Sequence, residues 1–143
     1  MDIPENQTSI VEKRLGEVAL VVENLQTMID FYREAVQLKL MRQTERMAFL
    51  EIAPGFAGHT SVLALFKRDR EADGKKGTLD HIAFSIALKD YESERVRLEA
   101  LGLTVTAKQH NWVQWRSLYV NDPEGNEVEL VCKDPSIPFN YDS

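Results

Sequence analysis

The sequence repeats itself once, and this repeat limits the folds that it can adopt. Residues 79–86 reproduce the apolar rhythm of residues 15–22, and His81 lies 64 positions after Glu17, at the same point of the repeat. Each segment is followed by a potential helix cap, Asn24 or Asp90, and then by apolar residues at three- and four-residue spacing. That pattern indicates an amphipathic helix. The repeat therefore predicts two similar half-sheets whose equivalent positions converge.

Short β-prone runs follow each predicted helix. They comprise residues 38–41, 47–52 and 61–66 in the first half, and residues 103–106, 117–120 and 128–132 in the second. Turn residues at 54–58 separate two of these strands, Gly102 suits a helix end, and the charged, glycine-containing residues 68–77 suit a linker. The sequence thus predicts an α+β fold of two tandem βαβββ modules, which form curled mixed sheets around a cup-shaped site. The predicted modules are 14–67 and 78–133, together one domain 14–133, with polar tails 1–13 and 134–143.

The composition narrows the classes of function. The net charge is -6, and the basic residues near the linker are interleaved with acidic ones, whereas nucleic-acid binding needs a basic face. No segment approaches the roughly 20 apolar residues of a membrane span, and residues 1–13 lack the apolar core of a signal peptide. The single cysteine, Cys132, cannot form an intramolecular disulfide. We therefore expect a cytoplasmic protein that binds neither nucleic acid nor a membrane.

Three chelating residues occupy related positions of the repeat. Glu17 and His81 are equivalent, and Glu129 points to the opposite face of its strand from Val128 and Leu130, because side chains alternate along a strand. If both half-sheets curl toward one face, these three side chains could bind a divalent metal (Fe, Mn, Ni, Co or Zn) and leave positions open for substrate. The alternatives are solvated strand carboxylates and a histidine satisfied by hydrogen bonds.

The chain resembles the vicinal oxygen chelate superfamily, which includes glyoxalase I, fosfomycin and bleomycin resistance proteins, methylmalonyl-CoA epimerase and extradiol dioxygenases. The resemblance covers residues 15–133 and rests on residues 16–22, 31–33, 79–84 and above all 119–130. It implies metal ligands at the positions of Glu17, Ala64, His81 and Glu129. Two of these depart from the family pattern, because the first is usually His or Gln and Ala64 cannot bind metal. The missing fourth ligand argues against glyoxalase I activity and suits a three-ligand dioxygenase better.

A second set of residues resembles the extradiol branch of this superfamily. His110 and Tyr119 precede Glu129 by nineteen and ten positions, a spacing similar to that of the substrate-facing His and Tyr of those enzymes. The resemblance implies catalytic acid–base roles for His110, Tyr119 and, with a displaced register, His59. The alternatives are a solvated loop histidine and an aromatic ring packed on the sheet. Trp112, Trp115 and Phe56 could line a pocket for a planar substrate, or could be core or dimer contacts.

The sequence therefore favours a metal-dependent enzyme that chelates vicinal oxygens of a small organic substrate, with dioxygenase-like chemistry preferred. Two carboxylates and a neutral imidazole cancel the charge of a divalent ion, which lowers its Lewis acidity and weakens the case for ring cleavage. One alternative is a metal-dependent isomerase, epimerase or lyase, and the other is a metal-free binding protein of the bleomycin-resistance kind. We also expect a homodimer, because half-sheets leave edges and faces uncovered. Whether the cup closes within one chain or across the dimer is left open.

Overall fold

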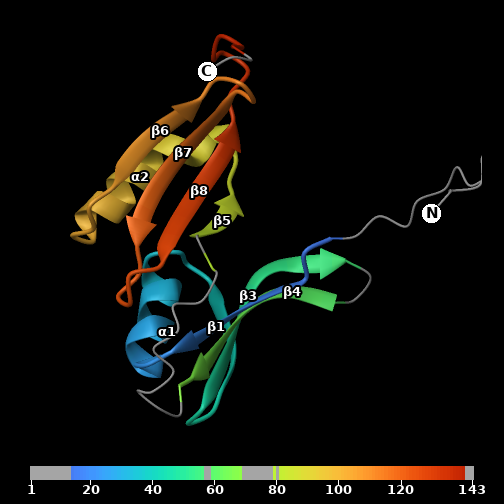
Figure 1. Cartoon of the computed structure of the whole chain (residues 1–143), viewed down its shortest axis with the longest axis vertical. Helices are drawn as coiled ribbons and strands as arrows, with labels where there is room; N and C mark the ends of the chain where they lie inside the picture. The colour runs from blue at the N-terminus through green and yellow to red at the C-terminus, as the bar shows by residue number, and fades with distance from the viewer. Residues whose placement is uncertain (1–13, 57–58, 69–78, 80, 141–143) are drawn as a thin grey trace, which may run out of the picture.

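The computed structural model describes residues 14–56, 59–68, 79 and 81–140, and it contains two four-stranded mixed sheets, one above the other in Figure 1. The first module consists of β1 (Glu17–Val22), α1 (Leu25–Glu34), β2 (Lys39–Gln43), β3 (Met47–Phe56) and β4 (His59–Lys67). The second consists of β5 (His81–Ser85), the short 3-10 helix η1 (Leu88–Asp90), α2 (Tyr91–Ala100), β6 (Thr106–His110), β7 (Trp115–Asn121) and β8 (Glu127–Lys133). The strand orders are β1-β4-β3-β2 and β5-β8-β7-β6. The predicted fold class is confirmed; the leader 1–13 and the linker residues 69–77 lie outside the described residues.

The two sheets share one register as well as one topology. In the first module Ala19 of β1 pairs with Ala64 of β4, and Ala64 pairs with Phe49 of β3. In the second module Ala83 pairs with Glu129, which pairs with Tyr119. Position 64 of the first module is therefore equivalent to position 129 of the second, as the repeat predicts.

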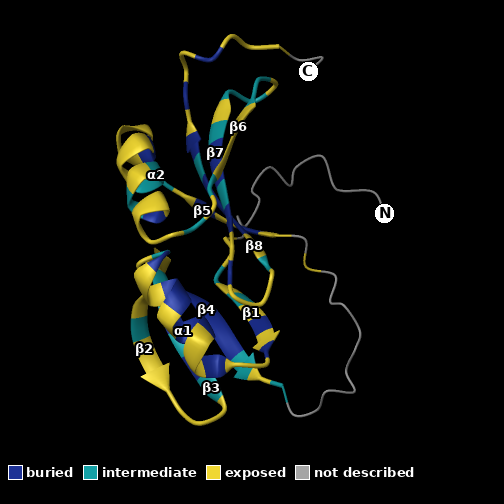
Figure 2. Ribbon diagram, turned by 90° about the vertical axis from the view of Figure 1, so that its left-hand side faces the viewer, coloured by how far each residue is buried: buried dark blue, intermediate teal, exposed yellow. Residues whose placement is uncertain are grey.

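Each sheet buries one face against its own helix. Leu20 and Val22 alternate with exposed residues on β1, and the helix opposite them contributes Met28, Ile29 and Tyr32, each with no exposed surface. In the second module α2 buries only Tyr91 and Leu98 on the sheet. The buried apolar strand residues there are Ile82, Phe84, Leu118, Val120, Val128, Leu130 and Cys132. Because strand side chains alternate, the residues between these buried ones share the opposite face of each sheet. Figure 2 shows buried stretches of β4 and α1 in dark blue.

Two predictions of local structure need correction. The turn predicted at 54–58 begins too early, because β3 continues through Phe56 with register shifts on either side of Ala53. These irregularities accommodate Pro54, and Gly55 adopts a φ of +80°, where an added Cβ would lie 1.8 Å from the His59 carbonyl oxygen. The strand predicted at 103–106 starts only at Thr106 and extends to His110.

The cap prediction succeeds for one helix and fails for the other. The Asn24 side chain accepts a hydrogen bond from the Thr27 amide at 3.0 Å, as expected for an N-cap. Asp90 makes no side-chain capping bond, because it has the helical dihedrals of η1, which continues directly into α2. No helix among the described residues is long and apolar enough to cross a bilayer.

Helix α1 is held at both ends by the second module. The Glu124 carboxylate accepts hydrogen bonds from the Glu23 and Asn24 amides at 2.8 and 2.9 Å, next to the helix N-terminus. At the other end the Arg97 guanidinium donates to the carbonyl oxygens of Glu34 and Ala35. A carboxylate at the N-terminus and a cation at the C-terminus both match the helix dipole and the unpaired backbone groups there. These contacts fix the second module against α1.

A buried hydrogen bond lies between these two ends. The Tyr32 hydroxyl donates to Asp122 Oδ2 at 2.8 Å, and burial together with the Asp122 charge raises the pKa of Tyr32 far above its ordinary range. Asp122 also accepts bonds from the backbone amides of Glu124 and Asn126 and from the Asn126 side chain. One carboxylate thus shapes the turn at 122–126 and joins it to the first module.

Candidate functional site

The face of the second sheet that points away from α2 carries most of the predicted site residues. We call it the site face, and it contains His81 of β5, Glu129 of β8, Ser117 and Tyr119 of β7, and His110 of β6. Each lies on the opposite face from the apolar core residues beside it, because the strands alternate. The alternation of the sequence is therefore what brings these polar groups to one surface.

Glu129 is the buried centre of this surface. Only 6% of the residue is exposed, yet both carboxylate oxygens have polar partners. Oε1 lies 3.3 Å from His81 Nε2, and Oε2 accepts a 2.6 Å hydrogen bond from the Ser117 hydroxyl. An imidazole nitrogen beside a carboxylate oxygen is a donor set that suits Mn, Fe, Co, Ni or Zn, so these residues fit part of a divalent-metal site.

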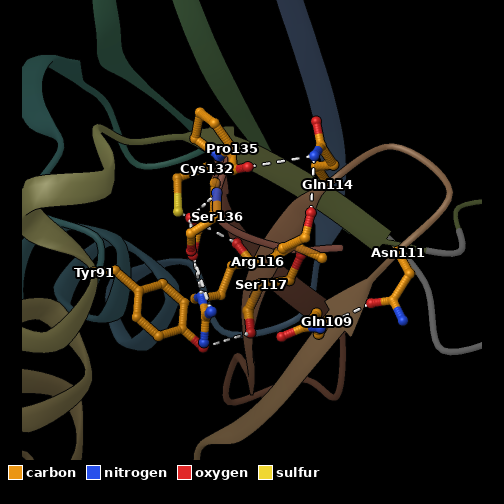
Figure 3. Close-up of polar contacts among 11 residues, drawn as sticks. Tyr91, Gln109, Asn111, Gln114, Arg116, Ser117, Cys132, Pro135 and Ser136 are labelled. Carbon is orange, nitrogen blue, oxygen red and sulfur yellow. Dashed lines mark hydrogen bonds and ion pairs between the residues drawn. The ribbon is translucent and has the colours of Figure 1, made fainter. Parts of the chain in front are cut away.

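Ser117 was not singled out by the sequence. It has no exposed surface, and its carbonyl oxygen accepts a hydrogen bond from the Tyr91 hydroxyl at 3.2 Å (Figure 3). The available signal was its spacing of two residues from Tyr119, which puts both side chains on one face. Its contact with Glu129 is diagonal across two strands, because Ser117 itself pairs with Val131.

His110 and Tyr119 lie together, as their predicted joint role requires. His110 Nε2 is 3.0 Å from the Tyr119 hydroxyl, on the site face. Burial raises the pKa of Tyr119 above its ordinary value of 10.0; a hydrogen bond with Ser117 opposes this shift, and the Glu129 charge adds to it. Tyr119 therefore keeps its proton at neutral pH, and the pair can donate or accept a proton next to Glu129.

Glu17 and His59 lie in the first module instead. Glu17 is exposed on β1, and the His59 ring lies against the adjacent Gly16, where an added Cβ would be 3.0 Å from the ring. Within the described part of one chain, no three His, Cys, Asp or Glu residues lie close enough to hold a metal ion. The ligand set of Glu17, His81 and Glu129 therefore stays a prediction, and the structure brings only the last two together in one chain.

The three aromatic residues proposed as pocket walls are also divided between the modules. Trp112 and Trp115 are about half exposed, and their rings lie 6.4 Å apart at the His110 end of the site face. Phe56 belongs to the first module, where the Arg14 guanidinium lies 3.9 Å above its ring. A single chain thus forms at most the tryptophan side of such a pocket.

Comparison with known proteins adds to this geometry. Residues 14–130 match the model of the Glyoxalase/Bleomycin resistance protein/Dioxygenase superfamily. Glutathione transferase FosA of Serratia marcescens is 28% identical over 117 residues, which cover 81% of this chain and 78% of that protein.

Two solved structures are similar in fold. The fosfomycin resistance protein FosX of Listeria monocytogenes has a TM-score of 0.65 at 20% identity, covering 87% of this chain and 97% of FosX. A mutant of FosX has been solved in complex with Mn(II) and a dihydroxypropylphosphonic acid. A lactoylglutathione lyase of Agrobacterium tumefaciens has a TM-score of 0.58 at 23% identity, covering 90% of this chain and 96% of the lyase.

Proposed function

Because the chain belongs to the glyoxalase/bleomycin resistance protein/dioxygenase superfamily, we propose that it is a metal-dependent enzyme acting on a small, oxygen-bearing organic substrate. The observation that carries this proposal is the buried Glu129 carboxylate, with one oxygen beside His81 and the other held by Ser117. A solvated strand carboxylate would be exposed, whereas this one is buried beside an imidazole that is itself partly exposed. His81 and Glu129 would hold a divalent ion, with Mn(II) the first candidate because FosX was solved with it.

We further propose that a second copy of the chain supplies the third ligand, Glu17. In one chain Glu17 is exposed on the other sheet, while His81 and Glu129 alone leave a divalent ion with too few protein ligands. Glu17, Ala19 and Val21 of β1 are exposed on the face of the first sheet opposite α1, so the first module of one copy could cover the site face of another. This arrangement makes the predicted homodimer a requirement of the site.

The proposed chemistry is proton transfer or nucleophile addition at a substrate bound through its oxygens. When bound, the metal would supply charge stabilisation at those oxygens. Two carboxylates and one imidazole favour this over oxygen chemistry, because the site carries no net positive charge. Tyr119, which retains its proton, would donate a hydrogen bond to the substrate, and His110 would pass the proton to or from it. The names of FosA and lactoylglutathione lyase, a transferase and a lyase, support the same class.

Dioxygenase-like chemistry is the second candidate, and a specific contact favours it. The His110–Tyr119 pair, 3.0 Å apart, is the arrangement that the resemblance to extradiol enzymes implied. Anaerobic loading with Fe(II), followed by oxygen-uptake measurements with catechols, separates the two candidates. Uptake dependent on His110 supports the dioxygenase, and its absence supports the first candidate.

A subunit-mixing experiment tests the shared site. Glu17→Ala and Glu129→Gln chains carrying different affinity tags would be co-expressed and the mixed dimer isolated. A site shared between copies gives this dimer one intact site and one doubly defective site, so Mn(II) binding returns to half a site per chain while each parent homodimer binds poorly. A mixed dimer as defective as its parents would contradict the shared site. Metal binding that is equal in wild type and Glu129→Gln would contradict the metal-dependent function itself.

A further inference from the structure

We infer that Ser117 is a positioning residue for Glu129: its hydroxyl binds Oε2 and so leaves Oε1, beside His81, as the carboxylate oxygen that would bind the metal. The inference rests on the proposed metal-dependent function. Its geometric basis is the 2.6 Å bond from Ser117 Oγ to Glu129 Oε2, opposite the 3.3 Å approach of His81 Nε2 to Oε1. Both partners are buried, with 0% exposure for Ser117 and 6% for Glu129.

A buried carboxylate with one unbound oxygen could rotate and present either oxygen to a metal. The Ser117 hydroxyl removes that freedom, because a hydrogen bond to a buried charged group is strong and leaving the oxygen unpaired is costly. Ser117 is itself fixed, since it lies in the middle of β7 and its carbonyl accepts the Tyr91 hydroxyl from α2. The helix that covers the back of the sheet thus supports the strand segment that orients the carboxylate at the front.

The repeat provides an independent comparison. Ser117 pairs with Val131 in the second module, and the equivalent pair in the first module is Met47 with Phe66. The position equivalent to Glu129 is Ala64. Where the carboxylate is absent, the hydroxyl is absent too, and both are replaced by apolar side chains. If Ser117 served only the strand pairing of the sheet, its replacement in the first module would not be expected to accompany the replacement of Glu129.

The test measures Mn(II) affinity of the purified protein by electron paramagnetic resonance of the free ion. Ser117→Ala should weaken binding about 10- to 100-fold, the usual effect of removing a partner of a metal ligand. Ser117→Thr, which keeps the hydroxyl, should recover most of the affinity. Ser85→Ala is the matched control, because Ser85 is exposed on β5 on the same face and should leave the affinity unchanged.

A double substitution separates positioning from a general packing effect. In the Glu129→Gln background, adding Ser117→Ala should cause no further loss, because the hydroxyl acts only through the carboxylate. If Ser117→Ala does not fold, Ser117→Cys replaces it, since a thiol of similar shape is a weak donor. The inference is overturned if the folded variant binds Mn(II) like wild type while Glu129→Gln does not. Equal binding by wild type and Glu129→Gln instead overturns the proposed function.

Discussion

The two modules have the same topology and register but different side chains on the face opposite the helix. At equivalent positions, the first module carries Phe49 and Ala64 where the second carries Tyr119 and Glu129. The first-module face is mainly apolar, and its Phe49 and Phe66 rings pack edge to face with centroids 6.0 Å apart. One copy of the repeat thus carries a polar site, whereas the other keeps an apolar surface suited to covering it.

The two modules also differ in the turn that connects their last two strands. The turn between β7 and β8 is fixed by Asp122, which links it to Tyr32, and by Glu124, which binds the start of α1. At the end of β3, by contrast, Gly55 lies close to the backbone of His59. The motif at 119–130 therefore combines two tasks, since it supplies Tyr119 and Glu129 to the site and fastens its module to α1. The second module, which carries the site face, is the site-bearing module of the proposed function, and the first module would add Glu17 from another copy.

The largest effect is expected at the position where the modules differ most. Glu129→Gln should weaken Mn(II) binding more than any other single substitution proposed for the site, because it removes the buried charge that pairs with the ion while keeping the shape of the side chain. Isothermal calorimetry on protein stripped of metal measures it. Glu127→Gln is the matched control, because Glu127 is exposed on the same strand and face and pairs with His81. A control variant as defective as Glu129→Gln would show that general surface charge, not this carboxylate, governs binding.

The next effect concerns the contact between the modules. Asp122→Ala should lower the free energy of unfolding by about 3 kcal/mol, because it leaves the buried Tyr32 hydroxyl and several turn donors without an acceptor. Urea unfolding followed by circular dichroism measures this loss. Tyr32→Phe, which removes only one of these bonds, should cost clearly less. Equal losses for both variants would mean that the turn itself contributes nothing.

A smaller effect is expected at the N-terminus of α1. Glu124→Ala should destabilise the protein by about 1 kcal/mol, the usual cost of losing a group that binds helix N-terminal amides. Thermal unfolding at low salt, compared with Glu45→Ala in the exposed β2–β3 turn, measures it. If the two variants unfold alike, the carboxylate does not stabilise the helix end.

The sequence was sufficient for features that follow from periodicity. The repeat, the equivalence of Ala64 and Glu129 and the Asn24 cap follow from spacing along single strands and helices. The pairing of His110 with Tyr119, which lie on neighbouring strands, was expected only from the resemblance to extradiol enzymes. Features that depend on how distant segments of the chain pack together could not be predicted from the sequence. The spacing of Ser117 from Tyr119 indicates only that both share one face of β7, whereas the contact of Ser117 with Glu129 depends on the exact pairing of β7 with β8.

Two other differences have similar causes. The link between Tyr32 and Asp122 joins residues 90 positions apart, so no local pattern reveals it. The strand expected at 103–106 begins later, because Leu103 and Val105 pack against the core as part of the connection from α2. At these positions tertiary packing determined the structure, and the local preference for a strand did not.

The smallest predicted effect on stability concerns Asp134, at the end of the second module, where the chain after β8 returns to the β6–β7 turn. Asp134 accepts hydrogen bonds from Ser136 and an ion pair from Arg116, which hold the pKa of Asp134 below its ordinary value of 3.8. Because the folded pKa is lowered, the carboxylate contributes stability above about pH 4, and that contribution disappears as the pH falls through the folded pKa. Asp134→Asn should therefore lower the thermal midpoint at pH 7 and have a smaller effect at pH 2.5. Asp90→Asn, at an exposed aspartate without a side-chain capping bond, is the control. A difference between wild type and Asp134→Asn that is the same at both pH values would show that the carboxylate charge is not what stabilises this end of the site-bearing module.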